Sequence, residues 1–271
     1  MIVSSSKRVR FSLVFPFHNE EKRLPRQLSA YARYIQSHGI EAEIICVDDA
    51  STDQSFRSVT ELIESEKFAF VQVFKLPSPG FKYGAVQAAF RLANAPLVGF
   101  VDTDDSLGPE TTFKLFTQLE DRVDDLDVVL GSRFTLGQSS LLNAGTTPFS
   151  TPDDHTHSLL TFRFTNMVSR LLYGLPFADV EIGLKVLKKS FAEVWDSQIK
   201  CQGNIFFDAE MLWILKKHGA RIAEFPIAWQ FRDNIFEDQG VGRSLLKTGR
   251  WWLHIAYYLG QTRLKHVFGK S

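Results

Sequence analysis

The chain has 271 residues, of which 44% are hydrophobic and 23% charged, so it can bury the core of one large globular domain. Its 31 basic and 31 acidic residues cancel, which excludes the strongly basic surface expected of a protein that binds nucleic acid. Two cysteines cannot form a disulfide framework, and this fits a reducing compartment.

The chain also lacks the patterns of secreted and membrane-spanning proteins. No apolar run approaches the roughly 20 residues that a membrane-spanning helix needs. The first residues, Met1 to Ser4, lead into polar and basic residues rather than the apolar core of a signal peptide. We therefore expect a cytoplasmic protein.

Short apolar runs alternate with helical patterns through the first half of the chain. The apolar runs predict strands at residues 11–15, 43–47, 70–74, 97–101 and 127–130. Between them the sequence predicts helices near 20–38, 53–66, 82–94 and 109–121, with Asp53 and Ser106 as N-caps and Pro109 in a first turn. Several strands are apolar on both faces, as in a parallel sheet covered by helices on both sides. The sequence therefore predicts a doubly wound α/β fold.

Residues 135–157 break this alternation. They are rich in Gly, Ser, Thr and Pro, and predict a long loop. A loop of this length inside a domain is usually functional, so we expect a lid over bound ligands. Four of its residues are metal ligands by residue type, although a solvated loop explains them more simply: Asp153, Asp154, His155 and His157.

The second half begins with a basic, amphipathic helix. No acidic residue occurs from Ser158 to Ala178, and four apolar residues recur there at helical spacing: Leu160, Phe164, Met167 and Leu171. A further helix is expected from Phe206 to Lys217, followed by a strand from Arg221 to Phe225.

The tail from Arg243 to Ser271 contains six Lys or Arg residues and no Asp or Glu. Its aromatic residues are Trp251, Trp252, Tyr257, Tyr258 and Phe268. Basic residues mixed with aromatic ones suit a helix that lies on an anionic membrane surface. The alternative is a helix docked on the protein with its aromatic side chains in the core, and the two interpretations are compatible.

Asp102-Thr103-Asp104 follows the apolar run at 97–101, where a buried strand would emerge into solvent. Two carboxylates this close repel each other unless a cation lies between them. Their oxygens suit Mg²⁺ or Mn²⁺, which usually also bind a substrate phosphate. Taken alone, the pair could equally belong to a turn, in which Asp is common.

Polar residues also follow three other predicted strands. In an open parallel sheet, ligands bind beyond the carboxyl ends of the strands. These ends carry Pro16-Phe17-His18-Asn19-Glu20, Val47-Asp48-Asp49-Ala50-Ser51-Thr52-Asp53 and Gly131-Ser132-Arg133. Because all of them fall on one edge, a single binding site explains them better than several unrelated turns.

Together with further motifs, these residues resemble family 2 glycosyltransferases of the GT-A fold, and especially dolichyl-phosphate mannose synthases and dolichyl-phosphate glucosyltransferases. The resemblance runs from about Phe11 to Trp229. Its further motifs are Gly80-Phe81-Lys82-Tyr83-Gly84-Ala85, Arg163-Phe164-Thr165-Asn166, Gly174-Leu175-Pro176-Phe177-Ala178-Asp179, Gly183-Leu184-Lys185-Val186, Phe207-Asp208-Ala209-Glu210 and Glu224-Phe225-Pro226-Ile227. The Gln-x-x-Arg-Trp signature of processive synthases is absent from the sequence, which argues against a polymerising enzyme.

The resemblance implies a GT-A domain at residues 8–232 and a tail at 233–271. Within the domain, a nucleotide-sugar-binding half at 8–134 and an acceptor half at 158–232 would flank the loop at 135–157. The implied fold is a Rossmann-like, mostly parallel sheet with helices on both faces.

For the donor, a GDP- or UDP-hexose, the resemblance implies a pocket in which apolar atoms meet the base and carboxylates accept hydrogen bonds. The residues it implies are Pro16, Phe17, Asn19, Glu20, Val47, Asp48, Asp49, Lys82, Asp102 and Thr103. Asp104 would be the main ligand of Mg²⁺ or Mn²⁺, while Asp102 would face the ribose or the metal's water shell. The metal would act as Lewis acid for the leaving nucleoside diphosphate. Mannose synthases often carry Gln where this chain has Ser106, so a third metal contact stays open.

For the acceptor, the resemblance implies a polyprenyl phosphate at a membrane surface. A phosphate monoester is already anionic near neutral pH, so it needs cations to hold it in line rather than a base. The implied cations are Arg133, Arg163 and Lys185, although the two arginines could instead form surface salt bridges. Direct in-line attack would invert the anomeric centre and give a β-linked product. The enzyme would be peripheral at the cytoplasmic face, or would need a membrane partner subunit.

Two other functions stay open at this point. If the acceptor is a saccharide or glycolipid hydroxyl, Glu210 or Asp208 becomes the catalytic base. A nucleotide-sugar-binding protein without catalysis is less favoured, because Asp102, Asp104, Arg133 and Lys185 are all intact.

Overall fold

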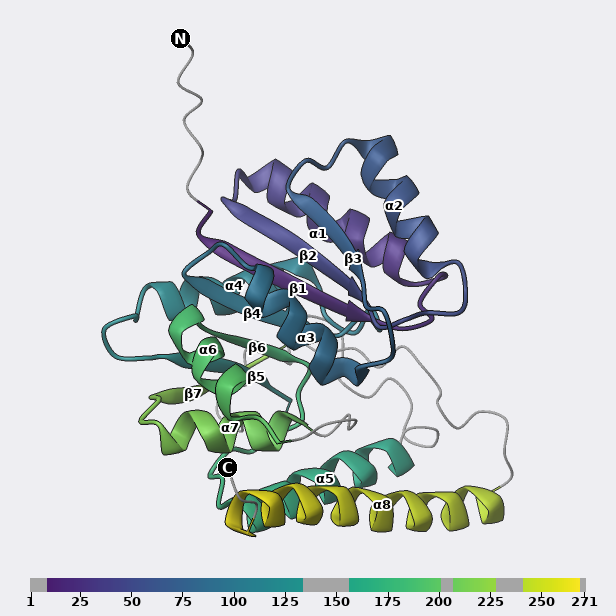
Figure 1. Ribbon diagram of the computed structural model, residues 1–271, viewed down its shortest axis with the longest axis vertical. Coiled ribbons are helices and arrows are strands. Elements are labelled where there is room, and N and C mark those ends of the chain that lie inside the picture. Colours follow the sequence, from purple (N-terminus) through teal and green to yellow (C-terminus); the bar gives the residue numbers. More distant parts are fainter. Residues whose placement is uncertain (1–8, 134–155, 201–206, 228–240, 269–271) are drawn as a thin grey trace.

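The computed structural model describes residues 9–133, 156–200, 207–227 and 241–268. Its centre is a seven-stranded sheet in the order β3-β2-β1-β4-β6-β5-β7 (Figure 1). The strands are β1 (Phe11–Phe17), β2 (Ala42–Asp48), β3 (Val71–Lys75), β4 (Leu97–Val101), β5 (Val128–Ser132), β6 (Leu184–Lys188) and β7 (Ile222–Pro226). In this sheet only β6 is antiparallel, and it lies between β4 and β5. The predicted mostly parallel α/β fold is confirmed.

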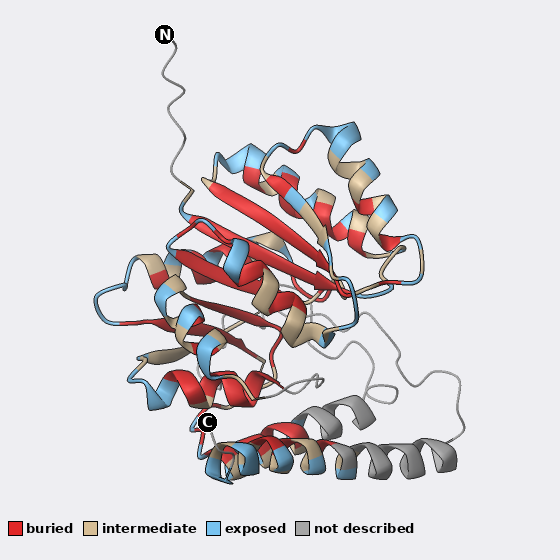
Figure 2. Cartoon of the chain, in the orientation of Figure 1, coloured by how far each residue is buried: buried red, intermediate tan, exposed pale blue. Residues whose placement is uncertain are grey.

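Helices cover both faces of this sheet. One face carries α1 (Leu24–His38), α2 (Ser55–Glu66) and α4 (Pro109–Glu120); the other carries α3 (Phe81–Leu92) and α6 (Lys189–Gln198), with α7 (Phe207–Lys217) beside α6. Successive residues of a strand point to opposite faces. Leu13 and Phe15 therefore pack in the cluster with α1, while Val14 packs in the cluster that contains Trp195 of α6. Figure 2 shows the central strands buried along their length.

Most element boundaries of the first half match the prediction to within a few residues, and Pro109 lies in the first turn of α4 as expected. The two predicted N-caps are wrong. The N-cap of α2 is Gln54 and that of α4 is Gly108. The carboxylate of Asp53, one position before this N-cap, accepts the backbone N–H of Ser55 at the start of α2 at 2.9 Å and that of Glu21 at 3.2 Å, so it also joins two loops.

Strand β6 and helix α6 are absent from the sequence prediction. The segment Leu184-Lys185-Val186-Leu187-Lys188 is short and contains two lysines, which usually indicate exposure. Lys185 is nevertheless fully buried, because its ammonium group is paired with Asp208 of α7. Strand β6 matters for function because it begins directly after Gly183, beside the end of β4.

Helices α5 (Thr156–Tyr173) and α8 (Val241–Phe268) lie side by side, away from the sheet (Figure 1). The rings of Phe164 and Trp252 stack with centroids 4.7 Å apart, and Tyr173 donates to the carbonyl of Leu259 at 3.2 Å. The predicted lid at 135–157 falls outside the described residues up to position 155, and so do Asp153, Asp154 and His155. None of the helices described has both the length and the apolar character needed to cross a membrane.

Candidate active site

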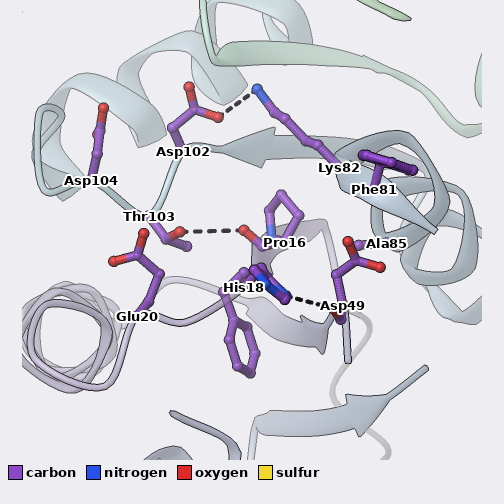
Figure 3. Close-up of a pocket in the computed structure, with 11 residues that line it drawn as sticks. Pro16, His18, Glu20, Asp49, Phe81, Lys82, Ala85, Asp102, Thr103 and Asp104 are labelled. Carbon is purple, nitrogen blue, oxygen red and sulfur yellow. Dashed lines mark hydrogen bonds and ion pairs between the residues drawn. The ribbon is translucent and has the colours of Figure 1, made fainter. Parts of the chain in front are cut away.

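A cavity of about 360 Å³ opens at the carboxyl edge of the sheet, beyond β1, β2 and β4 (Figure 3). Eight residues predicted for the donor and metal site line it: Pro16, Phe17, Glu20, Asp49, Lys82, Asp102, Thr103 and Asp104. Three further lining residues are His18, Phe81 and Ala85. Ala85 could have been found from its spacing, because a residue three positions after Lys82 shares its side of helix α3.

The loop after β4 holds Asp102 and Asp104 through backbone contacts. The N–H of Asp102 donates to the carbonyl of Gly183 at 2.9 Å, and Gln27 of α1 donates to the carbonyl of Asp102 at 2.9 Å. The carboxylate of Asp104 accepts the N–H of Ser106 at 3.0 Å. Ser106 is buried and does not line the cavity, so it supports Asp104 from within the loop.

The two carboxylates differ in their electrostatic surroundings. Burial, and next the charge of Asp102, raise the pKa of Asp104 above its ordinary value. Asp102 is compensated by Lys82, whose Nζ lies 2.5 Å from its Oδ1 (Figure 3). A cation that approached both aspartates would relieve the repulsion between them. The cavity therefore fits a divalent metal ion.

Gly183 determines where the side chain of Asp102 can lie. A Cβ atom at position 183 would be 1.8 Å from Oδ2 of Asp102, well inside van der Waals contact. The antiparallel strand β6 brings this glycine next to the end of β4. The carboxylate of Asp102 therefore lies against the backbone of Gly183, where no side chain blocks it. The sequence motif Gly183-Leu184-Lys185-Val186 contained this residue, but not the reason for it.

Asn19 and Asp48 join loops rather than line the cavity. The side-chain oxygen of Asn19 accepts the N–H of Thr52 at 2.9 Å, which ties the β1 loop to the β2 loop. Asp48 Oδ1 accepts the N–H of Ser51 at 2.8 Å, and its Oδ2 lies 3.3 Å from Nζ of Lys75. Val47, the other predicted donor residue that does not line the cavity, is buried in the core.

Asp49 and His18 form the wall at the end of β2. Asp49 Oδ1 accepts the N–H of Gly80 at 2.5 Å, and Nδ1 of His18 donates to the carbonyl of Asp49 at 2.7 Å. These contacts fix the start of α3, and with it Phe81 and Lys82, against the first two strands.

Backbone strain gathers in the same loops. Five described non-glycine residues have a positive φ, and four of them follow β1, β2 or β4 or begin α3: Asn19, Ala50, Phe81 and Asp105. Such conformations cost free energy and persist where the surroundings enforce them, which is typical of functional sites. An ion pair between Asp105 and Arg26 helps to hold the loop after Asp104.

Arg133 forms a bidentate ion pair with Asp179. Its Nε and Nη2 donate to the two carboxylate oxygens at 2.8 Å each, and its backbone N–H donates at 2.9 Å. Asp179 is fully buried, and Asn166 of α5 also donates to it at 3.4 Å. The pair is therefore a buried connection between β5 and the segment before β6, not the surface salt bridge considered above.

Lys185, Asp208 and Glu181 form a second charged group. The ammonium group of Lys185 is fully buried, paired with Asp208, and donates to the carbonyl of Ile182 at 2.6 Å. Glu181 accepts a hydrogen bond from Ser169 of α5 at 2.8 Å. Burial, and next the charge of Asp208, raise the pKa of Glu181 to about 7. The sequence reasoning did not single out Glu181.

Glu210 and Arg163 lie in different surroundings from each other. Glu210 is fully buried; its Oε1 accepts the N–H of Lys200 at 2.6 Å and lies 2.5 Å from Nε2 of His266 on α8. Arg163, in contrast, is exposed on α5. The buried carboxylate thus serves as a contact point for α8.

Residues 12–175 match the family model described as Glycosyl transferase family 2, which is more than half of the chain. The chain belongs to glycosyl transferase family 2. The predicted resemblance is confirmed, and the non-catalytic interpretation loses its support.

One relative of this chain is a dolichyl-phosphate beta-glucosyltransferase from Dictyostelium discoideum. The two are 26% identical over an aligned region of 232 residues, and the match covers 82% of this chain and 66% of that protein. The chain thus spans slightly less than two thirds of the length of this relative.

Two solved structures share the fold. Glucosyl-3-phosphoglycerate synthase from Mycobacterium tuberculosis, in complex with Mn²⁺, UDP-glucose and glycerol 3-phosphate, has a TM-score of 0.61 at 13% identity, covering 93% of this chain and 80% of that one. A mannosyltransferase from Pyrobaculum calidifontis, in complex with GDP-mannose and Mn²⁺, has a TM-score of 0.56 at 16% identity, covering 98% and 77%. These likenesses confirm the expected GT-A fold.

Proposed function

We propose that this chain is an inverting, metal-dependent hexosyltransferase that transfers a sugar from GDP- or UDP-hexose to a polyprenyl phosphate, giving a β-linked product. One observation carries the proposal: the cavity gathers Asp102, Asp104 and Lys82 at the carboxyl edge of the sheet, beside Pro16 and Phe17. This combination offers charge to a diphosphate with its metal and an apolar surface to a nucleoside. The relatedness to a dolichyl-phosphate beta-glucosyltransferase supports the lipid phosphate as acceptor.

The metal ion would be Mg²⁺ or Mn²⁺, held by Asp104 with Asp102 beside it. Within the described part of the chain, no group of three or more His, Cys, Asp or Glu side chains could hold a metal ion. We therefore expect donor phosphate oxygens and water to complete the coordination, as hard cations with few protein ligands require. When bound, the ion would stabilise the negative charge of the leaving nucleoside diphosphate.

On the acceptor side, Arg163 has a different role from Arg133 and Lys185 in this proposal. Arg133 and Lys185 are paired with Asp179 and Asp208, so we assign them to shaping the floor of the acceptor site. Arg163 is exposed on α5 and is the cation that an arriving phosphate can reach from solvent. Its planar guanidinium suits two phosphate oxygens.

A hydroxyl acceptor has less support. It would require Glu210 or Asp208 to accept a proton from substrate. Glu210 is instead engaged with Lys200 and His266, and Asp208 with Lys185. A phosphate acceptor needs no such base. This agrees with the structure, in which the carboxylates of Glu210 and Asp208 are already bonded to other residues of the protein.

Binding to a membrane surface is part of the proposal, because α5 and α8 expose apolar side chains. Seven of the ten exposed large hydrophobic residues in the described chain lie on these two helices: Met167, Leu171, Leu253, Tyr257, Leu264, Val267 and Phe268. On α5, Arg163 and Arg170 are exposed on the same side as Met167 and Leu171. An apolar stripe flanked by arginines suits the interface of an anionic membrane.

The test is direct. The protein is incubated with labelled UDP-glucose or GDP-mannose, Mn²⁺ and a polyprenyl phosphate, and organic-extractable label is counted. We expect label in the lipid fraction with at least one donor, and its loss by at least 100-fold in Asp104→Ala. Transfer of label to a saccharide, without any lipid product, would contradict the proposed acceptor.

A further inference from the structure

The metal site belongs to a cluster of six interacting charged side chains. Four are carboxylates and two are ammonium groups: Asp102, Asp104, Glu181, Asp208, Lys82 and Lys185. When all are ionised, the cluster carries two negative charges in excess, which one divalent ion would balance. Lys185 is buried and committed to Asp208, so Lys82 is the cation that faces the cavity.

Lys82 occupies an unusual position for a lysine. It lies in the first turn of α3, where the helix dipole disfavours a positive charge. Its Nζ lies 2.5 Å from Asp102 Oδ1, and 5.2 Å and 5.8 Å from the ring centroids of Phe100 and Phe207. The ammonium group is thus held at the edge of the cavity by the carboxylate of Asp102.

A lysine ammonium group and a divalent ion compete for Asp102. Two cations that share one carboxylate repel each other strongly in a partly buried site. Lys82 can leave Asp102 at low cost only when another anion receives its charge. The diphosphate of a donor, bound in the same cavity, is such an anion.

We propose that Lys82 holds Asp102 while the nucleotide is absent and moves to the diphosphate when the donor binds, so that metal and nucleotide bind as a pair. This inference rests on the metal site proposed above. The ordering prevents a divalent ion from occupying the carboxylates without a donor. Because coupling between two ligands is reciprocal, the ion and the nucleotide raise each other's affinity.

The experiment measures Mn²⁺ affinity by the loss of the free Mn²⁺ signal in electron paramagnetic resonance. Nucleotide-free wild-type protein, Lys82→Met and Lys75→Met are titrated in parallel. Lys75 is the matched control, because it is also paired with an aspartate, Asp48, at the end of a neighbouring strand. We expect Lys82→Met to bind Mn²⁺ at least tenfold more tightly than wild type, and Lys75→Met to stay within threefold of it.

The same titrations are then repeated with saturating UDP or GDP, so that the effect of the nucleotide on Mn²⁺ affinity can be compared between wild type and each variant. In wild type the nucleotide should raise Mn²⁺ affinity by a factor about ten times larger than in Lys82→Met, because only wild type releases Asp102 on binding. Adding Asp102→Asn to Lys82→Met should remove the gain. Lys82→Gln gives the same prediction, and circular dichroism confirms that each variant is folded.

The outcomes separate this inference from the proposed metal site. If wild type binds Mn²⁺ with UDP or GDP but Lys82→Met shows no gain without nucleotide, the role of Lys82 is overturned and the metal site stands. If wild type binds no Mn²⁺ even with nucleotide, both are overturned.

Discussion

Gly183 shows how a position without a side chain can determine the geometry of a charged group. Asp102 can face the cavity only because the backbone at residue 183 leaves room for its carboxylate. Small motifs that contain glycine are often attributed to turns, but the φ of Gly183 is not positive. The constraint here is close approach between a strand end and a side chain.

Gly183→Ala tests this constraint. The added Cβ would lie 1.8 Å from Asp102 Oδ2, so Asp102 or the start of β6 must move. We expect Mn²⁺-dependent nucleotide binding to fall at least tenfold, measured by calorimetry, and stability to fall by about 1–3 kcal/mol.

Gly84→Ala is the matched control for this variant. No atom lies within 4 Å of a Cβ at position 84, which is inside α3. Its stability should rise by up to about 1 kcal/mol, because alanine favours the helix more than glycine does. Equal losses in both variants would show that the contact with Asp102 is not the cause.

At the residue scale, the sequence predicted the residues that line the cavity better than the partners of the buried charges. Asp102, Asp104 and Asp49 follow apolar strands directly, so their place at the sheet edge could be inferred. The partner of Arg133 could not, because Asp179 lies 46 positions away in an irregular segment. Glu181 was not predicted for a similar reason, because only the folded chain places it beside Ser169 of α5.

At the scale of elements, α8 is apolar on two opposite sides. Ile255 and Leu259 are fully buried against the protein, while Leu253 and Tyr257 are 74% and 58% exposed. The predicted docked helix and the proposed membrane-facing helix are therefore two sides of one element. A helix that only docked would expose polar residues on its outer side.

Replacing the outer side should weaken membrane binding without disturbing the core. We expect Leu171→Ser with Leu253→Ser to lower binding to vesicles of anionic lipid at least fivefold in a sedimentation assay, because the exposed apolar area is reduced. Leu92→Ser, at a residue 42% exposed on α3, should leave binding unchanged. Equal binding by all three proteins would contradict a role for α5 and α8 at the membrane.

Elements with clear periodicity were predicted well, whereas β6 was not. Its burial depends on the pairing of Lys185 with Asp208, which no local pattern reveals. The N-cap of α2 was missed by one position. The carboxylate of Asp53 bonds both to Ser55 at the start of that helix and to Glu21 in another loop, and no local pattern reveals the second contact.

At the scale of the whole molecule, Glu181 makes stability depend on pH. Its pKa rises from 4.5 to about 7 on folding, so the folded chain holds a proton that the unfolded chain releases between these values. The contribution of Glu181 to stability is therefore greatest at low pH and is lost as the pH rises from about 4.5 to about 7.

We expect Glu181→Gln to remove this loss. In buffer with a chelator, the melting temperature of the variant relative to wild type should increase by a few degrees between pH 5 and pH 8. Glu193→Gln, at an exposed position of α6, controls for charge removal and should show no such trend. A pH-independent difference for Glu181→Gln would contradict the assignment.

The reversed strand β6 also has a consequence for synthesis. The ladder contacts of β5 are with β6 and β7, both of which follow it in the chain by more than 50 residues. While the ribosome makes the chain, strands β1 to β4 can form hydrogen bonds with one another early. Strand β5 has no strand to pair with until β6 and β7 have been synthesised, and until then the edge of β4 stays open. Such nascent edges attract other chains. The part of the chain that lines the cavity thus emerges first, and its sheet is closed only by a strand inserted afterwards.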